Sequence, residues 1–272
     1  MTYQCMTDGS ERLHMYATFV LSTGRCGTQW LTEKLQALYP DAVVEHEPLS
    51  FNYRPDVNTE RAPLQCNKEL IMQHLSCIQH YLDQGKPYIE TGFPCWRHLE
   101  WFKQQLGGRV KIIHVHREPL QTVSSLLKLN AFVPPFIPQL PIKNLFLPED
   151  GYGYFKDWQH LWPHLNPAEK NLWYWGEVQA HALLLQAQWP AADWLQLEFS
   201  TLFGPQAEAR LIHFLGDTPY AGVQPPGHVD QYGHALVPYP LEFPLMERLP
   251  AINHLAGQCG YGAIFPEAVI AN

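Results

Sequence analysis

The residues with the clearest chemical potential form the hexapeptide Arg25-Cys26-Gly27-Thr28-Gln29-Trp30. It follows the apolar run Thr18-Phe19-Val20-Leu21 and precedes a helical pattern of leucines over 31–38. A strand, a short turn with glycine and a helix together point free backbone N–H groups at an anion. Arg25 adds a permanent positive charge to the same turn. We therefore predict a loop that binds phosphate or sulfate.

The glycine spacing argues against two common nucleotide-binding loops. The dinucleotide pattern G-x-G-x-x-G is absent, because Gly24 and Gly27 are three positions apart and no third glycine follows. The Walker pattern is absent too, because no lysine follows Gly27. The loop thus lacks the lysine and the magnesium-binding hydroxyl of ordinary ATP or GTP hydrolysis. A kinase-like P-loop enzyme and a plain strand-to-helix turn stay open as alternatives.

A second stretch has the same organisation. Val110–His116 is a β-branched run that predicts a strand, and Arg117 stands at its C-terminal end, ahead of a helical segment that carries Ser125. Ligands collect at the C-terminal ends of strands in open α/β sheets. Arg117 can bind a phosphate with two parallel hydrogen bonds, and the Ser125 hydroxyl can donate to the same group.

These motifs resemble those of the sulfotransferases whose donor is 3′-phosphoadenosine 5′-phosphosulfate (PAPS). The hexapeptide matches the family loop [KR]-S-G-T-[TS]-W, except that Cys26 replaces serine and Gln29 replaces threonine. Arg-x-Pro at 117–119 with Ser125 eight positions after the arginine matches the element that binds the 3′-phosphate. Segments 194–202 and 211–216 look like the family's later strand and its helix ending in Phe-Leu-Gly.

The resemblance implies sulfuryl transfer from PAPS to an acceptor hydroxyl or amine. Arg25 would stabilise the leaving phosphate, since arginine is a poor proton donor but a fixed cation. Trp30 would lie near the adenine. The scheme requires no metal. The residues implied in donor binding are Arg25, Cys26, Gly27, Thr28, Gln29, Trp30, Arg117 and Ser125.

An acceptor hydroxyl also needs a base. The segment Val43–Pro48 predicts a strand that ends in polar residues, beside the first loop if it pairs next to Thr18–Leu21. In similar protein-tyrosine and carbohydrate sulfotransferases an acidic residue at this place is the base. Glu47 is its best match, and His46 is the rival. Glu90, near the end of a further short strand, is a third candidate for contact with acceptor or donor.

Cys26 supports a different hypothesis. A cysteine at a helix N-terminus beside Arg25 is expected to have a lowered thiol pKa, which would suit a thiol enzyme. A non-catalytic relative that binds nucleotide without turnover is also compatible with the sequence.

Composition predicts one α/β domain over residues 1–272. The alternation of strands and helices predicts a central parallel sheet flanked by helices, a P-loop NTPase-like three-layer sandwich. The net charge of −8 argues against a broad nucleic-acid interface. Six scattered cysteines without a C-x-x-C pair, and no long apolar segment, lead us to expect a cytoplasmic protein without membrane association.

The acceptor cannot be read from the chain. A small molecule, carbohydrate, lipid or peptide is compatible with it, and so is a homodimer. Residues 132–167, rich in proline and aromatic residues, predict an insertion that serves as an acceptor lid, or packs on its own core. His114 and His116 share one strand face, but spacing brings no further ligand near them, so we expect no metal.

Overall fold

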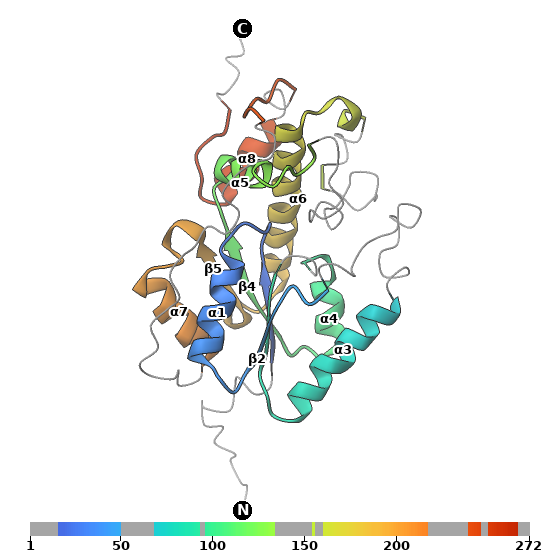
Figure 1. Cartoon of the computed structure of the whole chain (residues 1–272), viewed down its shortest axis with the longest axis vertical. Helices are drawn as coiled ribbons and strands as arrows, with labels where there is room; N and C mark the ends of the chain where they lie inside the picture. The colour runs from blue at the N-terminus through green and yellow to red at the C-terminus, as the bar shows by residue number, and fades with distance from the viewer. Residues whose placement is uncertain are drawn as a thin grey trace, which may run out of the picture.

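The computed structural model describes residues 16–49, 68–92, 96–133, 154–155, 160–216, 239–245 and 250–265. Within this part, a sheet of five parallel strands lies at the centre, in the order β2-β3-β1-β4-β5 (Figure 1). The strands are β1 (Ala17–Leu21), β2 (Val43–His46), β3 (Tyr88–Thr91), β4 (Val110–His116) and β5 (Trp194–Glu198).

Helices cover both faces of the sheet, which confirms the expected α/β architecture with three layers (Figure 1). Two of them pack on one face: α1 (Thr28–Leu38) and α7 (Pro205–Leu215). The others pack on the second face or extend beyond its upper end: α3 (Lys68–Asp83), α4 (Leu99–Gln105), α5 (Pro119–Leu127), α6 (Pro167–Gln188) and α8 (Pro250–Gln258). Short 3-10 turns occupy Trp96–His98, Trp162–His164, Ala191–Asp193 and Phe199–Thr201.

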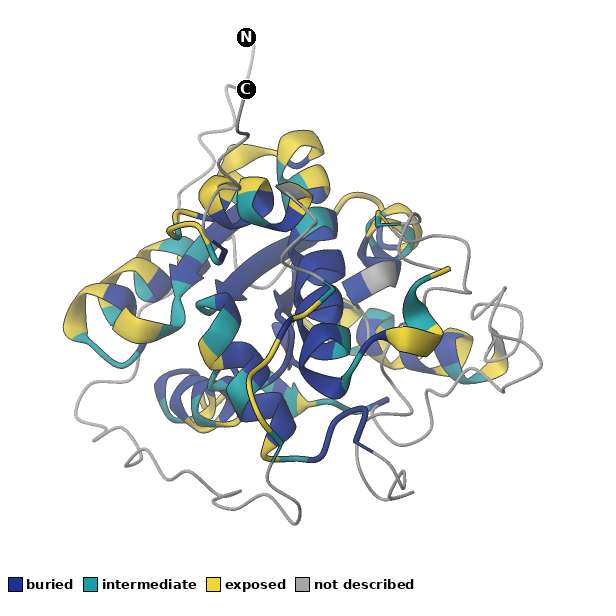
Figure 2. Cartoon of the chain, turned by 90° about the horizontal axis from the view of Figure 1, so that it is seen from above, coloured by how far each residue is buried: buried dark blue, intermediate teal, exposed yellow. Residues whose placement is uncertain are grey.

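Successive residues of a strand pack into two separate hydrophobic cores, one on each face of the sheet. Phe19 of β1 packs with α3, α4 and α6, whereas its neighbour Val20 packs with α1 and α7. All seven residues of β4 are buried, as expected for a strand covered on both faces. Figure 2 shows the buried strands in the centre, with exposed residues on the outer sides of the surrounding helices.

The strand order corrects one expectation. The strand predicted at Val43–Pro48 does not pair next to β1, because β3 lies between β2 and β1. Ile89 of β3 has Thr18 as its partner on one side and Val44 on the other. A local sequence pattern cannot specify this order, because parallel strands find their neighbours through contacts distant in sequence.

Helix α6 begins at Pro167, directly after a capping residue. Asn166 caps it: its side chain accepts the backbone N–H of Glu169, whose side chain accepts the N–H of Asn166 in return.

The predicted acceptor lid lies largely outside the described residues. Of its described residues, Phe132, Val133 and Phe155 all pack in or against the core. Among the described helices, none is both long and apolar enough to cross a membrane.

Candidate functional site

The loop between β1 and α1 has a strained, left-handed backbone. Gly24 and Gly27 each have φ of 73°, and Arg25, which is not glycine, has φ of 56°. At a residue other than glycine, a left-handed backbone costs on the order of 1–3 kcal/mol and tends to occur at functional sites. At Gly27 a Cβ atom would lie 3.2 Å from the Leu202 side chain and 3.3 Å from that of Phe203, so close packing also favours glycine there.

The N-terminus of α1 points out of this loop. The helix ladder starts with the Leu31 N–H donating to the Gly27 carbonyl over 2.9 Å. The N–H groups of the first turn have no carbonyl partner within the helix and make its start electropositive. Of the predicted donor-binding residues here, Thr28 is buried and Gln29 is exposed. Trp30 is half-buried, with its ring edge-on to Phe203 at 4.8 Å between centroids.

The two predicted phosphate motifs meet at the upper end of the sheet. Arg25 Nε donates to Ser125 Oγ over 3.0 Å, although the two residues are 100 positions apart. Arg117 Nη1 donates to the Arg25 carbonyl over 2.8 Å. The sequence-predicted residues Arg25, Arg117 and Ser125 are therefore assembled into one cationic cluster.

Arg117 is held by two further contacts, one to its guanidinium and one to its backbone. Its central carbon lies 4.2 Å from the centroid of the Phe199 ring, a cation–π contact. Its own backbone carbonyl accepts a hydrogen bond from the Trp175 indole over 3.0 Å. Ser125 is held on α5, where the Glu118 side chain caps the helix by accepting two backbone N–H groups. The cluster is thus built on regular elements rather than on loops alone.

Cys26 does not have the environment expected of a reactive thiol. Its side chain is fully buried, with Sγ donating to the Gly24 carbonyl at 3.2 Å and lying 3.3 Å from Thr23 Oγ1. Burial raises the pKa of the Cys26 thiol, and this outweighs the lowering by Arg117 and Arg25. The predicted lowering of its pKa was wrong, because the side chain turns under the loop rather than toward the helix terminus. The thiol-enzyme alternative is not favoured.

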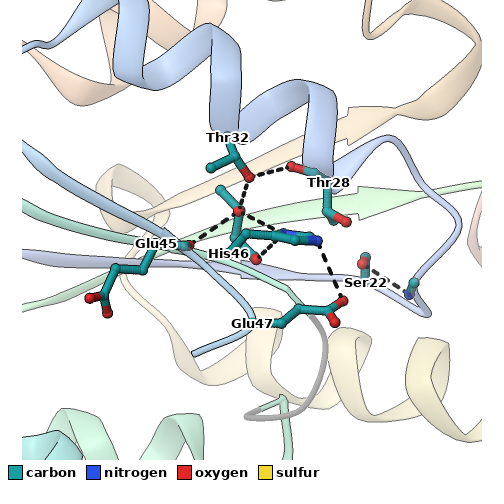
Figure 3. A network of polar contacts seen from close by, with 8 residues as sticks. Ser22, Thr28, Thr32, Glu45, His46 and Glu47 are labelled. Atoms are coloured by element: carbon teal, nitrogen blue, oxygen red, sulfur yellow. Dashed lines mark hydrogen bonds and ion pairs between the residues drawn. The ribbon is translucent and has the colours of Figure 1, made fainter. Parts of the chain in front are cut away.

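The polar end of β2 reaches the same region by a bend in the chain. Glu47 has φ of 46°, and its N–H donates to the Thr91 carbonyl over 3.0 Å. This bend turns the Glu47 carboxylate toward the loop that carries Ser22, whereas Glu45 points to the other side of the strand (Figure 3). Glu47 therefore faces the loop between β1 and α1 even though β2 is not paired with β1.

Gly92 makes this bend possible. A Cβ atom at Gly92 would lie 3.1 Å from the Glu47 backbone nitrogen and would collide with the Glu47 side chain. The end of β3 must therefore carry a residue without a side chain for Glu47 to occupy its position.

His46 is oriented by the neighbouring strand. Its Nδ1 lies 2.8 Å from the Thr91 carbonyl, which can only accept, so Nδ1 carries the hydrogen. Nε2 then faces Glu47, 3.9 Å from Oε1, too far for a direct hydrogen bond but close enough for electrostatic coupling. The Thr91 hydroxyl contacts that of Thr32, which donates to the Thr28 carbonyl and so links this pair to α1 (Figure 3).

Glu90 is engaged elsewhere. Its carboxylate is 2% exposed, lies 2.7 Å from His74 Nε2 and accepts from the Tyr88 hydroxyl over 3.0 Å. Tyr88 also lies within hydrogen-bond distance of Glu45, and burial followed by the two carboxylates raises its pKa well above the usual range. The Glu90 carboxylate is therefore already held inside the protein by His74 and Tyr88.

Several residues of this region have no signal in the sequence. Contacts to predicted site residues come from Thr91, which bonds His46, and from Trp175 and Phe199, which contact Arg117. In the sequence these three residues belong to a strand, a helix and a turn without any functional motif. Tyr174 lies in the same apolar helix stripe and is fully buried. Only the tertiary structure shows what these side chains contact.

The histidine pair on β4 is occupied by other partners. His114 Nε2 lies 3.0 Å from Gln179 Oε1, and His116 Nδ1 lies 2.6 Å from the Tyr261 hydroxyl. Within the described ranges, no group of three or more His, Cys, Asp or Glu side chains is arranged to hold a metal ion.

The fold and site together define a class: a parallel α/β sandwich with a glycine-containing, left-handed loop after its central strand. No protein-family model matches the chain, and no curated protein matches its sequence. Among solved structures, it is similar to the sulfotransferase domain of the Synechococcus PCC 7002 olefin synthase. The identity is 16%, the TM-score is 0.50, and the match covers 96% of this chain and 99% of that one.

Two further likenesses are weaker. The sulfotransferase domain from the curacin biosynthetic pathway matches at 14% identity and TM-score 0.49, over 92% of this chain and 99% of that one. A mouse sulfotransferase, solved in complex with PAP, matches at 16% identity and TM-score 0.40, over 79% and 69%. By its likeness to the olefin synthase domain, the chain has the fold of a sulfotransferase domain, which supports the resemblance drawn from its motifs at the level of the fold.

Proposed function

We propose that this protein transfers a sulfuryl group from PAPS to an acceptor hydroxyl or amine. The observation that carries the proposal is the assembly of Arg25, Arg117 and Ser125 at one end of the sheet, through the contacts Arg25–Ser125 and Arg117–Arg25. These are the residues that the PAPS resemblance selects, from two motifs far apart in sequence. The sulfotransferase fold supports the same reading.

The donor would lie across this cluster. Its 5′-phosphosulfate would bind the loop and the start of α1, where backbone N–H groups and Arg25 supply positive potential. Its 3′-phosphate would bind Arg117 and Ser125, a charged fork and a hydroxyl suited to phosphate oxygens. Trp30, half-buried beside Phe203, would lie near the adenine.

The transfer itself would be an in-line displacement. The acceptor oxygen forms a bond to sulfur while the bond from sulfur to the bridging oxygen breaks, which leaves adenosine 3′,5′-bisphosphate (PAP). Negative charge grows on the 5′-phosphate, and Arg25 stabilises it without giving up a proton.

Glu47 would take the proton of the acceptor. Its carboxylate faces the loop between β1 and α1, and Oε1 lies 3.9 Å from Nε2 of His46, which is held by Thr91. His46 remains the rival base, since its Nε2 points into the same space. The acceptor class, a homodimer and a cytoplasmic location stay predictions from the sequence.

Calorimetric titration tests the donor site first. Without added metal, we expect PAP to bind far more tightly than ADP or ATP, because only PAP carries the 3′-phosphate. Failure to bind PAP, or a preference for ATP with magnesium, would contradict the proposal and favour a kinase-like enzyme. Tight PAP binding with no turnover of PAPS on any acceptor panel would indicate a non-catalytic nucleotide-binding relative.

A further inference from the structure

Tyr174 carries a buried hydroxyl that the fold does not use. The side chain lies on α6 and is fully buried. In the part of the chain that the structure describes, its hydroxyl has no hydrogen-bond partner. An unpaired hydroxyl in a protein interior costs free energy, so such a group calls for an explanation, often an absent ligand.

The position of this hydroxyl points to the reaction centre. Tyr174 is within electrostatic range of both Cys26, in the loop after β1, and Glu47, in the bend after β2. The next residue, Trp175, bonds the Arg117 carbonyl over 3.0 Å. Tyr174 therefore lies near the loop after β1 and near the bend that carries Glu47, on the helix that also contacts Arg117.

The chemistry of the group limits its role. Burial, with Cys26 and Glu47 adding to it, raises the pKa of Tyr174 well above the usual range, so the phenol keeps its proton. It cannot compete with Glu47 as a base. What it can do is donate one hydrogen bond to an anionic oxygen placed between the loop and Glu47.

We propose that Tyr174 donates a hydrogen bond to a non-bridging oxygen of the sulfuryl group of bound PAPS. This inference rests on the proposed function. A fixed donor aimed at the group in transit would hold it in line between the leaving phosphate and the acceptor. The bond would be absent with PAP, which has no sulfuryl group, and this difference makes the role measurable.

The test compares the dissociation constants of PAPS and PAP for wild type, Tyr174→Phe and Tyr81→Phe. Tyr81 on α3 stacks on Tyr88 and supplies the matched control. We expect Tyr174→Phe to weaken PAPS by about tenfold, a typical loss for a hydrogen bond to a charged group, while PAP binding changes less than about twofold. Tyr81→Phe should leave both constants as in wild type.

The outcomes separate the two proposals. If wild type binds neither nucleotide, the proposed function fails, and this inference with it. If wild type binds both and Tyr174→Phe leaves PAPS unchanged, or weakens PAPS and PAP equally, only the role of Tyr174 fails.

Thermal unfolding without ligand tests whether Tyr174→Phe weakens PAPS binding only because it damages the fold. Because the hydroxyl is unpaired, we expect the Tm of Tyr174→Phe to equal or exceed that of wild type. A Tm lower by several degrees would mean that the hydroxyl has a structural partner, and would overturn the inference.

Discussion

Arg25 and Glu47 share an unusual backbone. Both have positive φ, 56° and 46°, and both stand directly after or near the end of a strand. Such strain persists only where surrounding contacts impose it: Arg117 holds the Arg25 carbonyl, and the Thr91 carbonyl and Gly92 hold Glu47. The two side chains assigned to leaving-group stabilisation and proton removal are thus fixed by their backbones as well as by side-chain contacts.

Replacing Glu47 by glutamine removes the proposed base while keeping its size. We expect turnover to fall by about 10²–10⁴-fold, the usual contribution of a general base, with PAP affinity unchanged. Initial rates with a verified acceptor and calorimetry provide the two measurements. His46→Asn should reduce turnover less; the reverse ranking would make His46 the base.

Replacing each of the two arginines by alanine should have a different effect. Arg25→Ala should weaken PAPS binding and reduce turnover by on the order of 10²-fold, because it removes the cation at the leaving phosphate. Arg117→Ala should instead reduce the preference for PAP over adenosine 5′-phosphate, since its proposed partner is the 3′-phosphate. Titration of each variant with both nucleotides checks this. Equal discrimination in wild type and Arg117→Ala would contradict the assignment.

At the scale of elements, α6 connects the site to the outer segments. Its buried Glu177 accepts the backbone N–H groups of Tyr154 and Phe155, each over 2.8 Å. Its buried Glu169 accepts that of Leu245, and so anchors a later segment to the same helix. The helix that carries Tyr174 and Trp175 is therefore also the one that holds two peripheral stretches in place.

Glu177→Gln should test this anchoring. An amide offers one accepting oxygen and turns an N–H group toward a second N–H, so we expect the free energy of unfolding to fall by about 2–3 kcal/mol. Urea denaturation measures the loss. Glu100→Gln, on the exposed side of α4, is the matched control and should change stability by less than about 0.5 kcal/mol. Equal stability of the two variants would show that the Glu177 charge contributes nothing.

How far the sequence predicts this architecture differs from element to element. The strand at Val110–His116 was predicted to the residue, because a β-branched run bounded by polar residues is a local signal. The neighbours of β2 were not predictable, because strand order depends on distant contacts. In the site, side-chain types identified Arg25, Arg117 and Ser125, but the burial that raises the pKa of Cys26 arises only when the loop folds over its side chain.

At the scale of the whole molecule, acid should destabilise the fold. His114 is fully buried, and burial together with His116 lowers its pKa to about 3, against 6.5 as the ordinary value. Below pH 6.5, His114 binds a proton in the unfolded chain but not in the native state. The free energy of unfolding therefore falls as the pH drops from 6.5 toward about 3.

Replacing His114 by glutamine should remove this contribution. Between pH 6.5 and about pH 5, wild type should lose about 1.6 kcal/mol more free energy of unfolding than His114→Gln, because half of the unfolded chains already bind the proton at pH 6.5 and each further pH unit adds up to about 1.4 kcal/mol. Urea denaturation at both pH values measures the two differences. Parallel losses in the two proteins would show that His114 does not titrate on unfolding.

The strand order also has a consequence for synthesis of the chain. β1 emerges first, yet both of its neighbours, β3 and β4, come much later, at residues 88–91 and 110–116. Until residues 88–91 have left the ribosome, the apolar segment 17–21 has two unpaired edges, and the edge next to β4 stays unpaired until residues 110–116 follow. Unpaired edges are sites for pairing with other chains. During synthesis this central strand would thus gain from protection by a chaperone until β3 and β4 can pair with it.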